Sequence, residues 1–65
     1  MRSPDRDMDY IIEFLRLGSA VKVSACDPVT LTEVCIVGSI HSPDWMLERT
    51  AVRKLKAAMA ARGAR

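Results

Sequence analysis

Two apolar runs near the start of the chain are separated only by Gly18 and Ser19. Residues 20–25 alternate between apolar and polar side chains, a pattern typical of a strand with one buried face. Residues 10–17 could form a helix by composition alone. A Gly-Ser pair between two such runs, however, is typical of a type II′ hairpin, in which glycine adopts the positive φ. The sequence therefore predicts two antiparallel strands joined by a two-residue turn.

A second turn is predicted at residues 28–31, followed by a third strand at residues 33–38. Pro28 has the φ that a turn requires, and the carboxylate of Asp27 can bond to nearby backbone. Leu31 stands where a loop of this length usually has a glycine in the left-handed region, so this turn is less regular than the first. Together the two turns predict a three-stranded antiparallel meander.

The two predicted turns can be checked against each other, because each one fixes a register. A two-residue first loop places Phe14 opposite Val23, and a four-residue second loop places Val23 opposite Ile36. A slip of one residue would move every side chain of a strand to the other face, so the agreement supports both turns. The core face of the sheet is then expected to hold Tyr10, Ile12, Phe14, Val21, Val23, Ala25, Val34 and Ile36.

A long amphipathic helix is expected after the sheet. Ser42 suits the N-cap, Pro43 suits the first helical position, and Gly63 can end the helix. The interior has no glycine or proline, which favours a helix. An apolar stripe that should cover the core face of the sheet consists of Leu47, Ala51, Val52, Leu55, Ala58 and Met59.

These elements predict one α+β domain over residues 9–63, a three-stranded antiparallel meander followed by one C-terminal amphipathic helix (β-β-β-α). Residues 1–8 are expected to form a flexible, solvated tail. No run of about 18 apolar residues is present, so no membrane segment is expected. The charged N-terminus also lacks signal-peptide character, so we expect a cytoplasmic protein with free thiols.

The second face of the predicted sheet has no helix to cover it, and half of its side chains are apolar. A chain of 65 residues buries only about 60% of its unfolded surface, so small domains often gain stability by oligomerising. Exposed apolar patches usually mark interfaces, although single apolar residues on a solvated face need no explanation. We therefore expect a homodimer, formed through this face or an edge strand, and allow for an unidentified protein partner. The candidate interface residues are Ile11, Leu15, Leu17, Cys35, Val37 and, near the start of the helix, Trp45.

The chain offers little that could support catalysis or hold a metal. Cys26 and Cys35 fall diagonally on one sheet face, near the upper limit for a disulfide, and His41 alone cannot complete a tetrahedral metal site. No serine–histidine–acid arrangement and no glycine-rich phosphate loop is visible in the sequence. We therefore expect a non-enzymatic protein with no catalytic residue, no cofactor and no metal.

Charge is divided unevenly along the chain, whose net charge is +2. Residues 1–48 hold four basic and eight acidic residues, whereas residues 49–65 hold six basic residues and no acidic ones. Cations in the last part of a helix suit its dipole. The same side chains also allow an alternative function, weak and salt-sensitive binding of nucleic acid without aromatic stacking. The candidates for that function are Arg49, Arg53, Lys54 and Lys56.

Several segments resemble a known family. They are Val21-Lys22-Val23-Ser24-Ala25, Asp27-Pro28-Val29-Thr30, Thr32-Glu33-Val34, Ile36-Val37-Gly38 and the helical Ala51-Val52-Arg53-Lys54-Leu55. Over residues 9–60 or so, the chain looks like a family of short, stand-alone, uncharacterised bacterial proteins. Members usually have glycine where Leu31 stands in this chain. The resemblance implies a stand-alone module and brings no activity and no site residues.

Overall fold

The computed structural model of the protein describes residues 10–63. Within this range three strands, β1 (Ile11–Leu17), β2 (Ala20–Asp27) and β3 (Thr32–Ser39), are followed by one helix, α1 (Asp44–Gly63). The strands form an antiparallel sheet in the order β1-β2-β3. The predicted β-β-β-α arrangement is therefore confirmed, while the predicted tail, residues 1–8, lies outside the described residues.

The first turn has the geometry that its Gly-Ser pair predicts. Gly18 has a φ of 63°, and the residues on either side of the two-residue loop pair with each other. The register that follows places Phe14 opposite Val23 and Val23 opposite Ile36. Both predicted registers are therefore confirmed, and with them the assignment of side chains to the two faces of the sheet.

The second turn keeps a leucine in the left-handed region. Leu31 has a φ of 62°, and its N–H donates a 2.8 Å hydrogen bond to the carbonyl of Asp27. The carboxylate of Asp27 accepts two further bonds, from the Val29 N–H at 3.2 Å and from the Thr30 hydroxyl at 3.0 Å. These bonds hold the turn although a leucine at this φ costs about 1–2 kcal/mol relative to the usual region.

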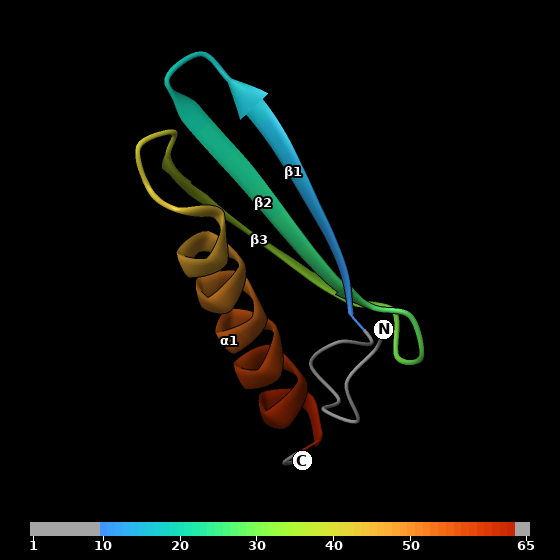
Figure 1. The fold of residues 1–65 in the computed structure, drawn as a ribbon. Helices are drawn as coiled ribbons and strands as arrows, with labels where there is room; N and C mark the ends of the chain where they lie inside the picture. The colour runs from blue at the N-terminus through green and yellow to red at the C-terminus, as the bar shows by residue number, and fades with distance from the viewer. Residues whose placement is uncertain (1–9, 64–65) are drawn as a thin grey trace, which may run out of the picture.

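The core lies between α1 and the two strands nearest to it. Figure 1 shows α1 running alongside β3 and β2, with β1 on the far side of the sheet. The side chains buried between these layers come from β2 and α1, and they are Val21, Val23, Ala25, Leu47, Ala51 and Leu55. Packed against them are the partly buried side chains of Tyr10, Ile12, Val34, Ile36 and Met59.

Phe14 is the exception in the predicted core. It pairs with the fully buried Val23, yet its own side chain remains 41% exposed. The sequence prediction assigns Phe14 to the correct face of the sheet but is wrong about its burial. The reason is that α1 packs on β2 and β3 and leaves β1 at the margin. The helix-facing side of β1 is therefore open where the pattern alone predicts a covered residue.

The close approach of α1 to β3 depends on Gly38. A Cβ atom built on Gly38 would overlap Cδ2 of Leu47, a buried residue near the start of α1. Glycine in a strand often marks such a close approach of another element. The absence of a side chain at this position lets the start of the helix pack directly on the strand.

Both ends of α1 differ by one residue from the prediction. The carbonyl of Pro43 accepts the N–H of Leu47 at 3.2 Å, so Pro43 rather than Ser42 is the first acceptor of the helix. At the other end, Gly63 belongs to the helix instead of following it. Turn-forming residues can serve at adjacent cap positions, which is why sequence patterns locate helix ends only to within a residue or two.

Candidate interaction surface

Strand β1 carries large apolar side chains that remain about half exposed. Ile11, Leu15 and Leu17 are 51, 54 and 53% exposed and lie on the face of the sheet opposite α1. Phe14 points to the α1 side and is exposed as well. Because β1 is an edge strand, a partner could reach it from either face and along its outer edge. We call Ile11, Phe14, Leu15 and Leu17 the β1 surface.

The face opposite α1 also brings Cys35 and Val37 together with β1, but not as one patch. Leu15 in β1 is level with Lys22 in β2 and Val37 in β3. Cys35 is level with Ser24. Lys22 and Ser24 therefore lie between the apolar residues of β1 and those of β3. The predicted apolar face is divided into two strips, of which the strip on β1 is the larger.

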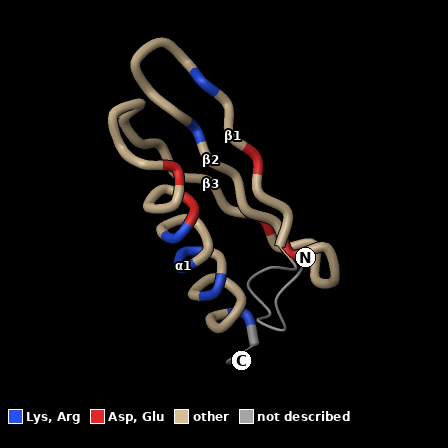
Figure 2. The backbone as a smooth tube through the Cα atoms, viewed as in Figure 1, with Lys and Arg blue, Asp and Glu red and all other residues tan. Residues whose placement is uncertain are grey.

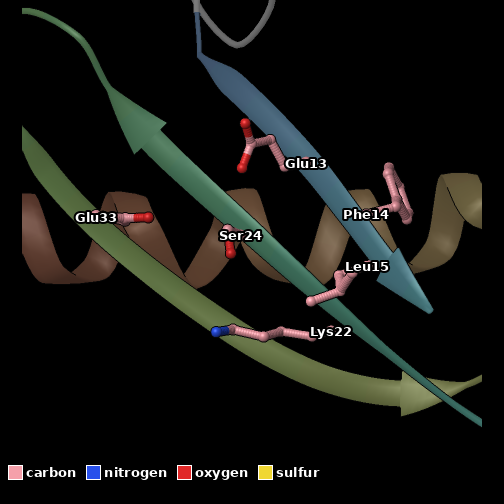
Figure 3. A pocket seen from close by; sticks show the side chains of 6 residues that line it. All are labelled: Glu13, Phe14, Leu15, Lys22, Ser24 and Glu33. Atoms are coloured by element: carbon pink, nitrogen blue, oxygen red, sulfur yellow. The ribbon is translucent and has the colours of Figure 1, made fainter. Parts of the chain in front are cut away.

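A shallow hollow of about 540 Å³ lies on this face, between the two strips. Figure 3 shows the short side chain of Ser24 near its centre, with Glu13, Glu33 and Lys22 around it. All of the lining side chains are exposed or half-buried. Since the carboxylates and the ammonium remain hydrated, the hollow can make polar contacts at a surface, and it lacks the enclosure that a small-molecule site requires.

The basic residues considered for nucleic-acid binding do not form one free group. Lys54 donates a 3.0 Å hydrogen bond from Nζ to the backbone carbonyl of Cys35 in β3. Arg49 and Arg53 are exposed on α1, and Lys56 is exposed and takes part in an interaction of its own. Figure 2 shows these cations spread along α1, after the acidic residues of its first turns. The positive charge is therefore distributed along the helix, with at least one cation engaged by the sheet.

The remaining candidates lie apart from the β1 surface. Trp45 is 60% exposed in the first turn of α1, so it belongs to the helix layer and not to the uncovered sheet face. Cys26 is a half-buried free thiol and Cys35 an exposed one. His41 is exposed, and its backbone N–H donates a 3.0 Å bond to the Ser39 hydroxyl.

Neither a cluster of metal-binding side chains nor a helix able to cross a membrane is present in the part of the chain that the structure describes. Within residues 10–63, no three His, Cys, Asp or Glu side chains gather in an arrangement that could hold a metal ion. No helix in that range combines the length and the apolar character needed to cross a bilayer.

One contact between the first residue of β3 and the helix had no signal in the sequence. Thr32 is a buried polar residue, only 5% exposed. Its Oγ1 lies 2.9 Å from that of Thr30 and accepts a 3.4 Å hydrogen bond from Nη1 of Arg62. The partners of Thr32 therefore come from the turn and from the far end of α1, and no local spacing could have revealed the second of them.

The order of the sheet, the helix on one of its faces and the open edge at β1 define a small α+β domain built from a three-stranded meander and a helix. The chain belongs to the DUF6898 family, a domain of unknown function, whose family model matches residues 7–62. No curated protein and no solved structure matches the chain.

Proposed function

We propose that this protein is a small, non-enzymatic interaction module that forms a homodimer through the β1 surface. The observation that carries the proposal is the exposure of β1 on both faces: Ile11, Leu15 and Leu17 on one and Phe14 on the other. Apolar side chains gathered on one edge strand are typical of an interface, whereas scattered ones are typical of a solvated surface. The free thiols suit a reducing compartment, and we propose the cytoplasm.

The energetics favour an association that depends on concentration. Burying a large apolar side chain completely contributes about 1.5–3 kcal/mol, so a half-exposed one can still contribute about 1 kcal/mol. Four such residues on each of two copies would supply about 8 kcal/mol. Association costs about 4–15 kcal/mol in lost translational and rotational freedom. Contacts from other residues must therefore add to the β1 surface, and a weak, reversible dimer is expected.

Sedimentation equilibrium across a wide range of concentrations tests the proposal. The chain should move from monomer to dimer as its concentration rises. The double variant Ile11→Lys, Leu17→Lys should stay monomeric, because it places charges on the β1 surface. Val29→Lys is the matched control, since Val29 is 86% exposed in the second turn and is not part of the β1 surface.

Two results would contradict the proposal. The first is an unmodified chain that remains a monomer at every concentration. The second is a double variant that dimerises as tightly as the Val29→Lys control. Either result would show that the β1 surface does not hold two copies together.

A further inference from the structure

The backbone of β1 offers unpaired hydrogen-bonding groups along its outer edge. The Ile40 N–H bonds to the Ser19 carbonyl at 3.2 Å, which extends the ladder between β2 and β3. Because the bonding direction alternates along a strand, odd-numbered residues of β2 bond to β3 and even-numbered residues bond to β1. On β1, the residues between those bonded partners direct their N–H and C=O groups away from the sheet, and they are Ile12, Phe14 and Arg16.

The other edge of the sheet is closed in a way that β1 is not. The same alternation directs the backbone groups of Cys35 in β3 away from β2. The Cys35 carbonyl is occupied by Nζ of Lys54, at 3.0 Å, and α1 packs beside this strand. Covering an edge strand with a helix is a common means of preventing edge-to-edge pairing. Of the two edges, β1 is therefore the one available to an added strand.

We propose that β1 pairs with β1 of a second copy, antiparallel and centred on Phe14, to give one continuous six-stranded sheet. This inference rests on the proposed self-association and specifies how it occurs. Phe14 of one copy then lies opposite Phe14 of the other, and Ile12 lies opposite Arg16. The three outward-facing residues of each strand would exchange about six backbone hydrogen bonds across the symmetry axis.

The extent of β1 selects this register over its neighbours. β1 runs from Ile11 to Leu17, so Phe14 is its middle residue and the proposed pairing uses the whole strand. A pairing centred on Glu13 would place two carboxylates directly opposite each other, which is destabilising. A pairing centred on Leu15 would leave the first residues of each strand without a partner. If the symmetry axis fell between two residues, backbone groups that point away from β2 would lie opposite residues whose backbone groups point toward their own β2, and the hydrogen bonds could not form.

The side chains of the two copies also complement each other in this register. On the helix side, the half-exposed Phe14 rings meet beside the buried Val23 of each copy. Figure 3 shows the Phe14 ring lying off the outer edge of β1, where the second copy would add its strand. On the other face, Ile11 lies opposite Leu17. Each residue of the β1 surface therefore gains an apolar neighbour or, for Leu15, a place beside Glu13.

Charge is complementary across the same axis. Leu15 of one copy lies opposite Glu13 of the other, and Lys22 is level with Leu15 in its own sheet. Each Lys22 therefore lies in one row with Glu13 of the second copy, with β1 between them. The long lysine side chain can extend over Leu15 toward that carboxylate. Two pairs of Lys22 and Glu13 form by symmetry. Parallel pairing of the two β1 strands, with Phe14 opposite Phe14, would place Leu15 opposite Leu15 and form neither pair.

A disulfide experiment tests the register directly. In a Cys26→Ser, Cys35→Ser background, Phe14→Cys should link the two copies under mild oxidation, because directly opposite residues have Cα atoms about 5.5 Å apart. Arg16→Cys is the matched control, on the same strand and the same side. In the proposed register the two Arg16 positions are offset by four residues, about 14 Å, and cannot be bridged. A link at Arg16→Cys and none at Phe14→Cys would overturn the register.

A proline variant separates the edge from the face. Arg16→Pro removes an N–H that the monomer does not use, so the fold should persist, as proline is accepted on an outer edge. The dimer should weaken at least tenfold in sedimentation equilibrium, while Val37→Lys, on the far strip of the face, should leave it unchanged. The opposite pattern would show face-to-face packing and refute the edge inference alone. A chain that is monomeric at every concentration would refute the proposed function itself.

Discussion

The ammonium of Lys54 in α1 donates a 3.0 Å hydrogen bond to the backbone carbonyl of Cys35 in β3. The two residues are 19 positions apart in the chain, and the bond ties the helix to one outer edge of the sheet. The helix packs mainly on β3 and β2, and β1 lies at the margin of the layer that it covers. One edge of the sheet is therefore closed by the chain's own helix, and the other is left open.

Replacing Lys54 should open the edge at β3. We expect Lys54→Met to leave the fold intact and to lower the free energy of unfolding by about 0.5–1.5 kcal/mol, the usual contribution of one hydrogen bond. With two open edges, the chain should form species larger than a dimer at high concentration. Light scattering measures these species, and Arg53→Met is the control on an exposed helix position. Equal behaviour of the two variants would show that Lys54 does not protect the edge.

Leu31→Gly should stabilise the protein. Leu31 has a φ of 62° and is 77% exposed, so the change relieves backbone strain and removes little packing. The left-handed region costs a non-glycine residue about 1–2 kcal/mol, and the greater freedom of glycine in the unfolded chain offsets part of the gain. We expect the free energy of unfolding to rise by about 0.5–1 kcal/mol in urea titration.

Val29→Gly is the control for that change, because Val29 occupies the same turn without a positive φ. It should lower stability through the unfolded chain alone. If Leu31→Gly were as destabilising as Val29→Gly, the strain attributed to Leu31 would be wrong.

Gly38→Ala should destabilise the protein through Leu47. The added Cβ would overlap Cδ2 of Leu47, and overpacking of this kind costs about 1–3 kcal/mol. Combining Gly38→Ala with Leu47→Ala should cost less than the sum of the single changes, since the smaller side chain makes room for the methyl group. Chemical denaturation of the four proteins in this cycle measures the coupling. Strict additivity would mean that the two residues do not contact each other.

Nucleic-acid binding, the alternative function, is expected to be weak. Arg49 and Arg53 are exposed, but Lys54 is bonded to the sheet, and the charges are spread along α1. We expect labelled RNA or DNA to bind no tighter than non-specific complexes do, about 10⁻⁴–10⁻⁶ M at physiological salt. Arg49→Ala with Arg53→Ala should weaken that binding further. Binding in the nanomolar range would make nucleic acid the better functional assignment.

Most of the fold could be predicted from the pattern of the sequence. Gly18 fixes a two-residue turn, the turn fixes the register, and the alternation of side chains then assigns each strand residue to a face. Leu31 stood out for the same reason, because the loop length demands a left-handed residue at its position. Both inferences succeed because turn geometry is a local property of the chain.

The partial exposure of the Phe14 side chain and the contacts of Thr32 could not be predicted in this way. Alternation assigns Phe14 to the helix side but does not say how far the helix extends across the sheet. Thr32 directly follows the predicted turn, and it is buried with a hydrogen bond from Arg62, which lies 30 positions away in the chain. The open edge at β1 depends on the same packing of α1, so the sequence alone predicts association through the apolar face or an edge strand and does not say which edge is open.

A dilution series followed by amide NMR tests self-association through β1 most directly. As concentration rises, the N–H signals of residues 11–17 should shift together along one binding curve, while that of Val29 in the second turn stays in place. Signals of residues 11–17 that are independent of concentration would contradict the account, and so would shifts confined to α1.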